Sequence, residues 1–259
     1  MDILEKTKKF YLGYKGEKFV IGKSEFNKPI YCFAVKKTER PKVIIQYCIH
    51  AREYVTAYLA LKHIDRFNEY AKFGTVYFIP IMNPDGVKIC LDFNPLYKAN
   101  GRGVDLNVNF DARWGTGEFN KTSAGDKDFI GEKPFSERET KALRDFTIDI
   151  KPDLTISYHA KGEEIYWQFF QDKATCVRDL ALAKAVARLT GYKIKATPNS
   201  AGGYKDWCVQ ELKIPALTIE VGPDELTHPI TEESIDDIYI KNERVPEMVT
   251  EYLWERICR

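Results

Sequence analysis

Four side chains with the chemistry to bind and use a metal ion lie at the ends of short apolar segments. His50 and Glu53 stand three residues apart after one segment, His159 ends a second, and Glu220 ends a third. Zinc accepts imidazole nitrogens and carboxylate oxygens at about 2.0–2.2 Å. Two histidines and one carboxylate leave a fourth position open for water, and the remaining glutamate can act as the base. The set indicates a catalytic metal site, whereas His50 and Glu53 alone would also suit a solvated helix N-terminus.

The segments that precede these residues have the pattern of strands buried on both faces. Val43–Ile49 is an apolar, largely β-branched run without polar alternation, and Asp153–Tyr158 and Ala216–Ile219 are shorter runs of the same kind. From Ala51 the apolar residues return at helical steps of three and four. Sheets of this kind bind ligands just beyond the carboxyl ends of their strands. We therefore expect these ends to deliver the metal-binding side chains.

The rest of the chain alternates between strand and helix signals. Further strands are predicted at Lys28–Val35, Thr75–Ile81 and Ile165–Phe170. Residues 36–41 read as a hairpin-like connection, residues 83–86 as a β-turn, and residues 87–131 as a long functional loop region. Helices are predicted at 51–73, from Ser136 (with a capping box to Glu139) to before Pro152, at 172–189, at about 203–212, and at 231–259 with an interruption near Pro246.

Composition bounds the possible functions. The 259 residues are 44% apolar, enough for a full core, and we expect residues 1–259 to form one catalytic domain. The 39 Lys and Arg residues nearly balance the 38 Asp and Glu residues, which argues against nucleic acid or a membrane surface as partner. The N-terminus lacks the apolar segment of a secretory signal, and no apolar run reaches about 18 residues. The six scattered cysteines form no Cys-x-x-Cys pair and are expected to be reduced thiols.

Six motifs, in order and spacing, resemble the zinc carboxypeptidases of the carboxypeptidase A type. The resemblance runs from about Lys28 to the C-terminal helix. It rests on His50-Ala-Arg-Glu53, Asn83-Pro-Asp-Gly86, Gly103-Val-Asp-Leu-Asn107, Ser157-Tyr-His159, Gly202-Gly203-Tyr-Lys-Asp-Trp207 and Thr218-Ile-Glu220. It implies an α/β fold, a three-layer α/β/α sandwich around a mixed, largely parallel sheet, with one catalytic zinc ion per chain. Another divalent metal in the same ligand set remains an alternative.

The resemblance also implies a role for each site residue. His50, Glu53 and His159 match the zinc ligands, and Glu220 matches the general base. Relatives place an oxyanion-stabilising arginine shortly before the Gly-Val-Asp-Leu-Asn motif, and the candidates in this chain are Arg102 and Lys98. We favour Arg102, because a guanidinium presents several donors in a fixed geometry.

The substrate pocket departs from the family pattern. Exopeptidases of the family hold the terminal carboxylate with an Asn-Arg pair, where this chain has Asn107 and Val108. Their substrate-covering tyrosine should lie where this chain has Pro198 and Asn199. Tyr204 and Lys205, after the glycine pair, are assigned to the pocket, in which a cation at position 205 would favour an anionic substrate. The alternative for Lys205 is an exposed lysine on a short helix.

These departures resemble a bacterial branch of the family that cleaves γ-D-glutamyl-meso-diaminopimelate bonds in peptidoglycan peptides. We therefore expect a small peptide or muropeptide substrate and, without an export signal, a cytoplasmic location, with a spore compartment as the alternative. The runner-up is a carboxypeptidase for ordinary peptides that uses Arg113 or another cation as its clamp. A deacylase of small molecules and a catalytically silent binding module of the same fold are further alternatives.

Overall fold

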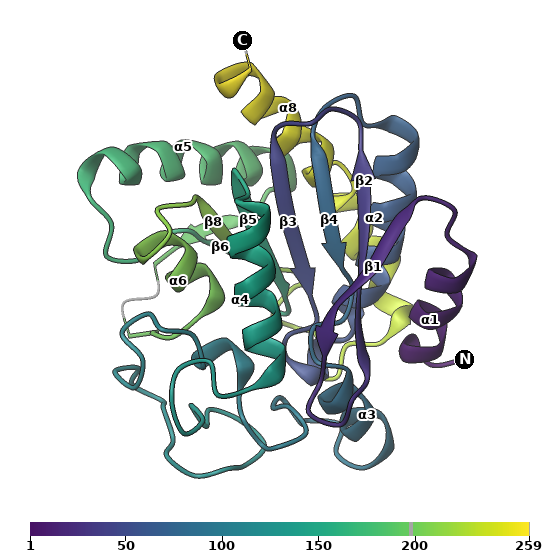
Figure 1. Cartoon of the computed structure of the whole chain (residues 1–259), viewed down its shortest axis with the longest axis vertical. Helices are drawn as coiled ribbons and strands as arrows, with labels where there is room; N and C mark the ends of the chain where they lie inside the picture. Colours follow the sequence, from purple (N-terminus) through teal and green to yellow (C-terminus); the bar gives the residue numbers. More distant parts are fainter. Residues whose placement is uncertain (197–198, 259) are drawn as a thin grey trace.

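A single eight-stranded sheet organises the computed structural model, which describes residues 1–196 and 199–258 (Figure 1). The strands follow the spatial order β1-β2-β4-β3-β5-β8-β6-β7. Their bounds are Glu17–Lys23 (β1), Pro29–Lys36 (β2), Lys42–Tyr47 (β3), Thr75–Ile79 (β4), Leu154–His159 (β5), Glu164–Tyr166 (β6), Lys193–Lys195 (β7) and Ala216–Glu220 (β8).

The four central strands run parallel to one another. β3 pairs in parallel with β4 on one side and with β5 on the other, and β5 pairs in parallel with β8. Antiparallel pairs flank this centre, between β1 and β2, β2 and β4, and β6 and β8. The prediction of a mixed, largely parallel sheet is confirmed, and the carboxyl ends of β3, β5 and β8 lie at the same edge.

Helices cover both faces of the sheet, which confirms the three-layer sandwich. α2 packs on β2, β3 and β4 and contacts α1, α7 and α8, whereas α4 packs on β1 and α6 on β5 and β8. The helices are α1 (Ile3–Gly13), α2 (Val55–Tyr70), α3 (Pro84–Asp92), α4 (Arg138–Ile150), α5 (Lys173–Thr190), α6 (Tyr204–Gln210), α7 (Ile235–Asn242) and α8 (Val245–Ile257), with short 3-10 turns at Ala51–Glu53, Leu106–Val108 and Glu232–Ser234.

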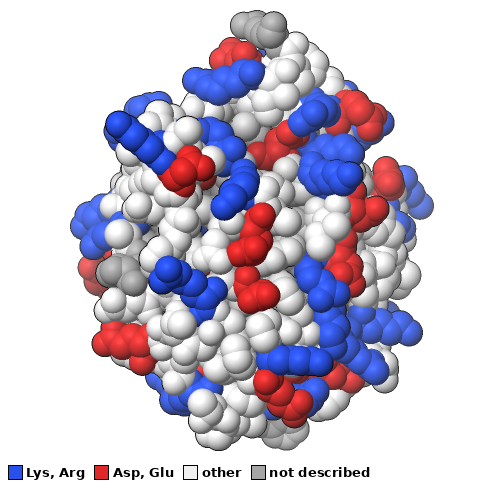
Figure 2. Space-filling model, turned by 60° about the vertical axis from the view of Figure 1, so that its left-hand side comes forward, with Lys and Arg blue, Asp and Glu red and all other residues white. Residues whose placement is uncertain are grey.

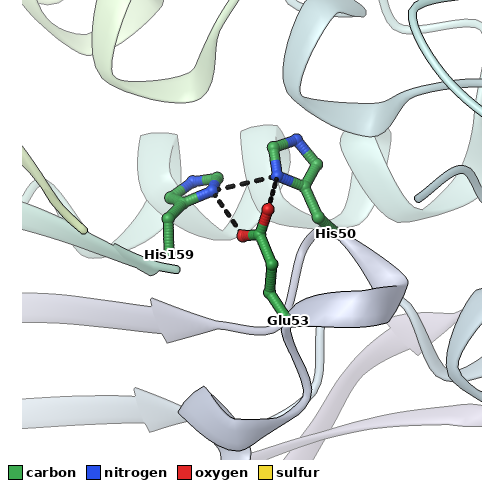
Figure 3. A group of neighbouring side chains, drawn as sticks. All are labelled: His50, Glu53 and His159. Carbon is green, nitrogen blue, oxygen red and sulfur yellow. Dashed lines mark hydrogen bonds and ion pairs between the residues drawn. The ribbon is translucent and has the colours of Figure 1, made fainter. Parts of the chain in front are cut away.

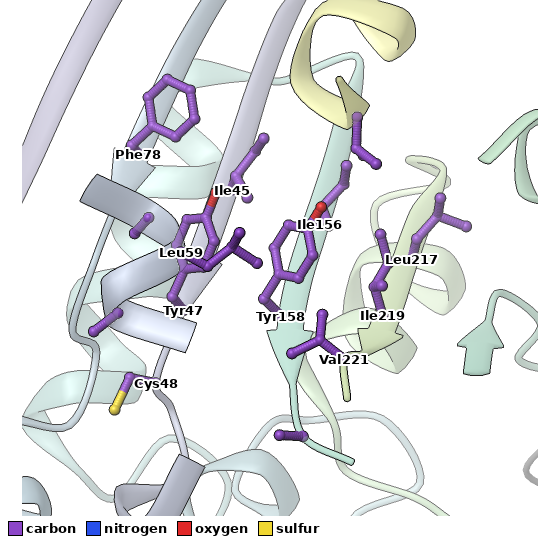
Figure 4. Close-up of a cluster of buried hydrophobic side chains, with 14 of the residues drawn as sticks. Ile45, Tyr47, Cys48, Leu59, Phe78, Ile156, Tyr158, Leu217, Ile219 and Val221 are labelled. Carbon is purple, nitrogen blue, oxygen red and sulfur yellow. The ribbon is translucent and has the colours of Figure 1, made fainter. Parts of the chain in front are cut away.

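The central strands are apolar at successive positions because each face of the sheet has its own core. Ile45 and Tyr47 belong to the cluster under α2, whereas Ile44 belongs to the cluster under α4 and α6. Tyr47 stacks on Tyr158 of the neighbouring strand, with ring centroids 4.9 Å apart and planes at 3° (Figure 4). This packing holds β3 against β5 just before the chain reaches His50 and His159.

Several local predictions are wrong, among them the strand at Ile165–Phe170, which ends at Tyr166. Residues 83–86 begin α3 instead of forming an isolated turn, because Asn83 caps the helix by accepting a hydrogen bond from the Gly86 backbone N–H (2.9 Å) and Pro84 occupies the first turn. The connection predicted at residues 36–41 does not close a hairpin, because β4 lies between β2 and β3. The helix expected from Ala51 is divided into a 3-10 turn and α2.

The surface carries both signs of charge. Figure 2 shows one face, on which basic and acidic side chains are interspersed among uncharged ones. Charge selectivity at a site must therefore come from a few local residues rather than from the field of the whole molecule. All six cysteines are unpaired, as expected, and none of the described helices has the length and apolarity that a membrane span requires.

Candidate metal centre

The chain leaves β3 in a tight turn that presents His50 and Glu53. His50 precedes the 3-10 turn Ala51–Glu53, and the hydroxyl of Thr56 closes the loop by accepting from the Cys48 backbone N–H (2.9 Å) and donating to the Glu53 carbonyl (2.8 Å). His159 is the last residue of β5, every residue of which is buried. The two strands that carry the histidines are direct neighbours, so the predicted ligands are brought together.

The three predicted ligands form one compact, buried cluster (Figure 3). His50 Nδ1 lies 2.9 Å from one oxygen of Glu53, and His159 Nδ1 lies 3.0 Å from the other. The two Nδ1 atoms are 3.1 Å apart. Ligand atoms about 2.0–2.1 Å from zinc in a tetrahedral site are roughly 3.3 Å from one another. The nitrogen and oxygen donors are therefore spaced almost as zinc requires.

Asp105 supports His50 from the side opposite the cluster. Its Oδ1 lies 3.2 Å from His50 Nε2 and its Oδ2 lies 2.8 Å from Lys98 Nζ. A carboxylate at Nε2 favours the tautomer with the proton on that nitrogen, which leaves the Nδ1 lone pair free for a metal ion. Asp105 is within a motif quoted above, but sequence reasoning assigned it no role.

The charges around the cluster match this arrangement. Burial alone would raise the pKa of Glu53, but the neighbouring His50 and His159 hold it well below its usual range. Burial likewise would lower the pKa of His50, but the carboxylates of Glu53 and Asp105 raise it. The cluster thus contains an ionised carboxylate between two imidazoles, a donor set that fits a divalent cation.

Glu220 ends β8 directly opposite His159 in the parallel register with β5. Burial raises the pKa of Glu220 to about 8, opposed by His159 and reinforced by Glu53. A divalent cation in the adjacent cluster would favour the ionised form, which a general base needs. The predicted base is therefore beside the predicted ligands without belonging to them.

The structure separates the two candidates for the oxyanion cation. Lys98 is held by Asp105, the residue that also supports His50, and burial leaves its side chain 18% exposed. Although burial lowers the pKa of Lys98, Asp105 raises it overall, so the ammonium stays charged. Arg102, which sequence reasoning favoured, is 45% exposed and pairs instead with Glu132 (3.5 Å) and Glu137 (4.0 Å). Lys98 is therefore the cation connected to the metal centre.

Asn107 lies where the segment before α6 approaches the loop after Asp105. Its Oδ1 accepts a hydrogen bond from the Tyr204 backbone N–H (3.2 Å), and its Nδ2 has no hydrogen-bond partner among the described residues. The approach is close enough that a Cβ on Gly202, whose φ is +82°, would lie 2.7 Å from the Val108 carbonyl oxygen. Only glycine fits there, and the Asn107 amide remains available to a ligand.

The structure revises the predictions for Tyr204 and Lys205. Tyr204 is fully buried and its hydroxyl shares a hydrogen bond with Thr147 Oγ1 (2.8 Å), so its side chain is part of the core and not of a substrate pocket. Lys205 is 6% exposed, so the alternative of an exposed lysine is wrong. Its ammonium pairs with Asp206 and donates to the Gln168 carbonyl (3.0 Å), which neutralises the charge offered to an anion. Pro198 lies outside the described residues.

Comparison with known proteins agrees with the geometry. The sequence model of the zinc carboxypeptidase family matches residues 16–242. Gamma-D-glutamyl-L-diamino acid endopeptidase 1 of Lysinibacillus sphaericus is 30% identical over 186 aligned residues, which cover 64% of this chain and 46% of that protein. Murein peptide amidase A of Escherichia coli (strain K12) is 32% identical over 160 aligned residues, covering 55% of this chain and 56% of the amidase. The alignments thus span about half the length of these relatives.

Solved structures share the fold. Bovine thrombin-activatable fibrinolysis inhibitor, solved in complex with tick carboxypeptidase inhibitor, superposes with a TM-score of 0.84 at 22% identity, over 98% of this chain and 95% of that one. The murein-tripeptide amidase of Escherichia coli O157 superposes with a TM-score of 0.65, also at 22% identity, over 91% and 92% of the two chains.

Proposed function

The chain belongs to the zinc carboxypeptidase family, and from that premise we propose that it is a zinc-dependent peptidase that hydrolyses the γ-D-glutamyl-meso-diaminopimelate bond of peptidoglycan peptides. Zinc-dependent hydrolysis is supported by one observation: His50, Glu53 and His159 form one donor cluster, and Glu220 lies beside it. The choice of substrate rests on the residues of the pocket and on the relatives.

His50, Glu53 and His159 would hold the zinc ion. When bound, zinc supplies a Lewis acid for the scissile carbonyl and lowers the pKa of water. Glu220 takes a proton from the attacking water and later gives it to the leaving amine, as general base and then general acid. Its place at the end of β8, next to but outside the ligand set, suits both transfers.

Lys98 stabilises the negative charge that develops on the carbonyl oxygen. A fixed cation in a water-poor site can contribute several kcal/mol to such stabilisation, because it needs no reorganisation during the reaction. Asp105 holds the Lys98 ammonium in place and keeps it protonated. The same carboxylate orients His50, so one residue positions both the metal ligand and the oxyanion donor.

Two features favour a γ-glutamyl-diamino acid peptide as substrate. Val108 offers no charge to the C-terminal carboxylate of an ordinary peptide, while the adjacent Asn107 retains a free amide donor. The relatives from Lysinibacillus sphaericus and Escherichia coli carry names that refer to γ-D-glutamyl-diamino acid bonds and to murein peptides. A substrate with several carboxylates would use local cations of the pocket.

Product analysis by mass spectrometry tests the proposal. Zinc-loaded protein is incubated with L-Ala-γ-D-Glu-meso-diaminopimelate and, separately, with ordinary L-peptides that differ in their C-terminal residue. Release of free diaminopimelate from the first, without C-terminal trimming of the second, is the expected result. Release of C-terminal L-amino acids alone would instead identify an ordinary carboxypeptidase and would reject the substrate assignment.

A further inference from the structure

Two adjoining hollows lie along the loop after Asn107. The first, of about 390 Å³, is lined by Lys98 and Val108, and the second, of about 460 Å³, is lined by Arg113. Glu118 and residues 199–201 line both. Lys98 pairs with Asp105, which contacts His50, so the first hollow lies close to the metal centre, and the shared lining residues join it to the hollow at Arg113.

Hydrogen bonds to Gly202 fix the backbone that leads into Arg113. The Gly202 N–H donates to the Ala112 carbonyl (2.8 Å), and the Phe110 N–H donates to the Gly202 carbonyl (2.9 Å). Arg113 itself has a φ of +50°, a conformation that a residue with a Cβ adopts at a cost of the order of 1 kcal/mol or more. Surrounding structure therefore imposes the direction in which this side chain leaves the loop.

The guanidinium of Arg113 is oriented but not neutralised. It lies over the ring of Phe170, with 3.5 Å between Arg113 Cζ and the ring centroid. No carboxylate lies within ion-pair distance of it among the residues that the structure describes, and the nearby Glu118 accepts a hydrogen bond from Asn199 Nδ2 (2.5 Å). Stacking on an aromatic face leaves the in-plane N–H groups free for a carboxylate.

Two other cations near the site, unlike Arg113, already have a carboxylate partner. Lys98 is paired with Asp105, and Lys205 is paired with Asp206. Lys98 is assigned to the reacting carbonyl and Asp206 neutralises Lys205, whereas an unpaired guanidinium is free to form strong, often bidentate bonds to a carboxylate. Arg113 is therefore the group in these hollows best prepared to recognise an anion.

We propose that Arg113 binds the distal carboxylate of the substrate's diaminopimelate residue, the one on the carbon remote from the scissile amide. The assignment rests on the proposed function. Diaminopimelate has a second carboxylate at the end of its side chain, and L-lysine has a hydrogen atom in its place. Arg113 thus makes the enzyme distinguish a γ-D-glutamyl-diaminopimelate peptide from the corresponding lysine peptide, while Lys98 acts at the reacting carbonyl of both.

The test compares kcat/KM for L-Ala-γ-D-Glu-meso-diaminopimelate and L-Ala-γ-D-Glu-L-Lys in zinc-loaded wild type and Arg113→Met. A hydrogen bond to a charged group contributes enough binding for a loss of about 10- to 100-fold with the diaminopimelate peptide. The lysine peptide should change by less than about twofold, because it has no carboxylate for Arg113 to bind. Arg113→Lys should keep part of the preference through its charge.

Arg256→Met is the matched control, because Arg256 also lies 3.5 Å over an aromatic ring, that of Tyr252 on α8. It should leave both peptides unaffected. Equal losses with both peptides in Arg113→Met, or no loss with the diaminopimelate peptide, overturn the assignment of Arg113 while leaving the proposed function intact. A wild-type protein that cleaves neither γ-glutamyl peptide overturns the proposed function itself, and the assignment with it.

Discussion

Asp105 and His50 form a buried pair on the side of the imidazole that faces away from the ligand cluster, with 3.2 Å between Asp105 Oδ1 and His50 Nε2. Burial would raise the pKa of Asp105, but Lys98 and His50 hold it far below its usual range, so the carboxylate is ionised. This carboxylate favours one tautomer of a candidate metal ligand and holds the cation assigned to the oxyanion. The proposed roles in metal binding and in catalysis are therefore linked through one side chain.

Asp105→Asn should weaken zinc binding by about 10- to 100-fold, because an amide orients His50 less strongly and adds less to its basicity. The measurement is the zinc dissociation constant, obtained by competition with a chromophoric chelator. Asp236→Asn, which alters an 81% exposed carboxylate paired with Lys62, serves as control and should not change the constant. An unchanged zinc affinity in Asp105→Asn would show that the contact does not support the ligand.

Glu220→Gln should retain stoichiometric zinc and lose turnover by about 10²- to 10⁴-fold, because the amide cannot accept and return a proton. Glu164→Gln is the matched control, since Glu164 lies opposite Glu220 in the antiparallel register between β6 and β8. Zinc content by atomic absorption and kcat on the diaminopimelate peptide are measured for both. If the two variants lose turnover equally, Glu220 has no special role in proton transfer.

Lys98→Met should lower kcat by about 10²- to 10³-fold with a smaller change in KM, because the cation acts mainly on charge that develops in the transition state. Arg102→Met tests the rival assignment with the same chemical change and should leave kcat near the wild-type value. The reverse pattern would restore Arg102 as the oxyanion cation. Thermal unfolding of each zinc-loaded variant separates a catalytic loss from the instability caused by leaving Asp105 unpaired.

The convergence of the candidate metal ligands was predictable because strand ends determine their positions. His159 and Glu220 end two neighbouring parallel strands, and His50 follows the end of a third, so apolar runs followed by a polar residue were sufficient. The carboxyl ends of such strands meet wherever the strands are in register. That the sheet is mixed and largely parallel followed from the family resemblance, and the structure agrees.

The pocket was less predictable because its charges are paired through space. Nothing in the sequence shows that Asp105 forms an ion pair with Lys98, or that Arg102 forms one with Glu132. Lys205 and Asp206 are adjacent on a helix, where successive side chains do not normally face each other, yet both are buried and paired. α3 was missed because Asn-Pro-Asp-Gly satisfies a β-turn and a helix N-terminus equally well.

The buried His63 should make stability fall with decreasing pH. Its Nε2 lies 3.0 Å from the Asn242 carbonyl oxygen, which can only accept, so Nδ1 must accept from the Tyr47 hydroxyl (2.8 Å). The ring is thus held neutral, and burial lowers its pKa to about 3, with a smaller opposing effect of the Asn242 carbonyl. Above the unfolded pKa of about 6.5 this residue does not penalise folding.

Between about pH 6.5 and 3 the unfolded state binds one more proton at His63 than the folded state, so the free energy of unfolding falls by about 1.4 kcal/mol per pH unit. His63→Gln can keep both hydrogen bonds but cannot titrate. Urea denaturation of zinc-loaded protein at pH 7 and pH 5 should therefore show wild type losing about 2 kcal/mol more than the variant. All other titrating groups are common to both proteins and cancel in this difference. Equal losses would mean that His63 binds its proton in the folded protein as readily as in the unfolded chain.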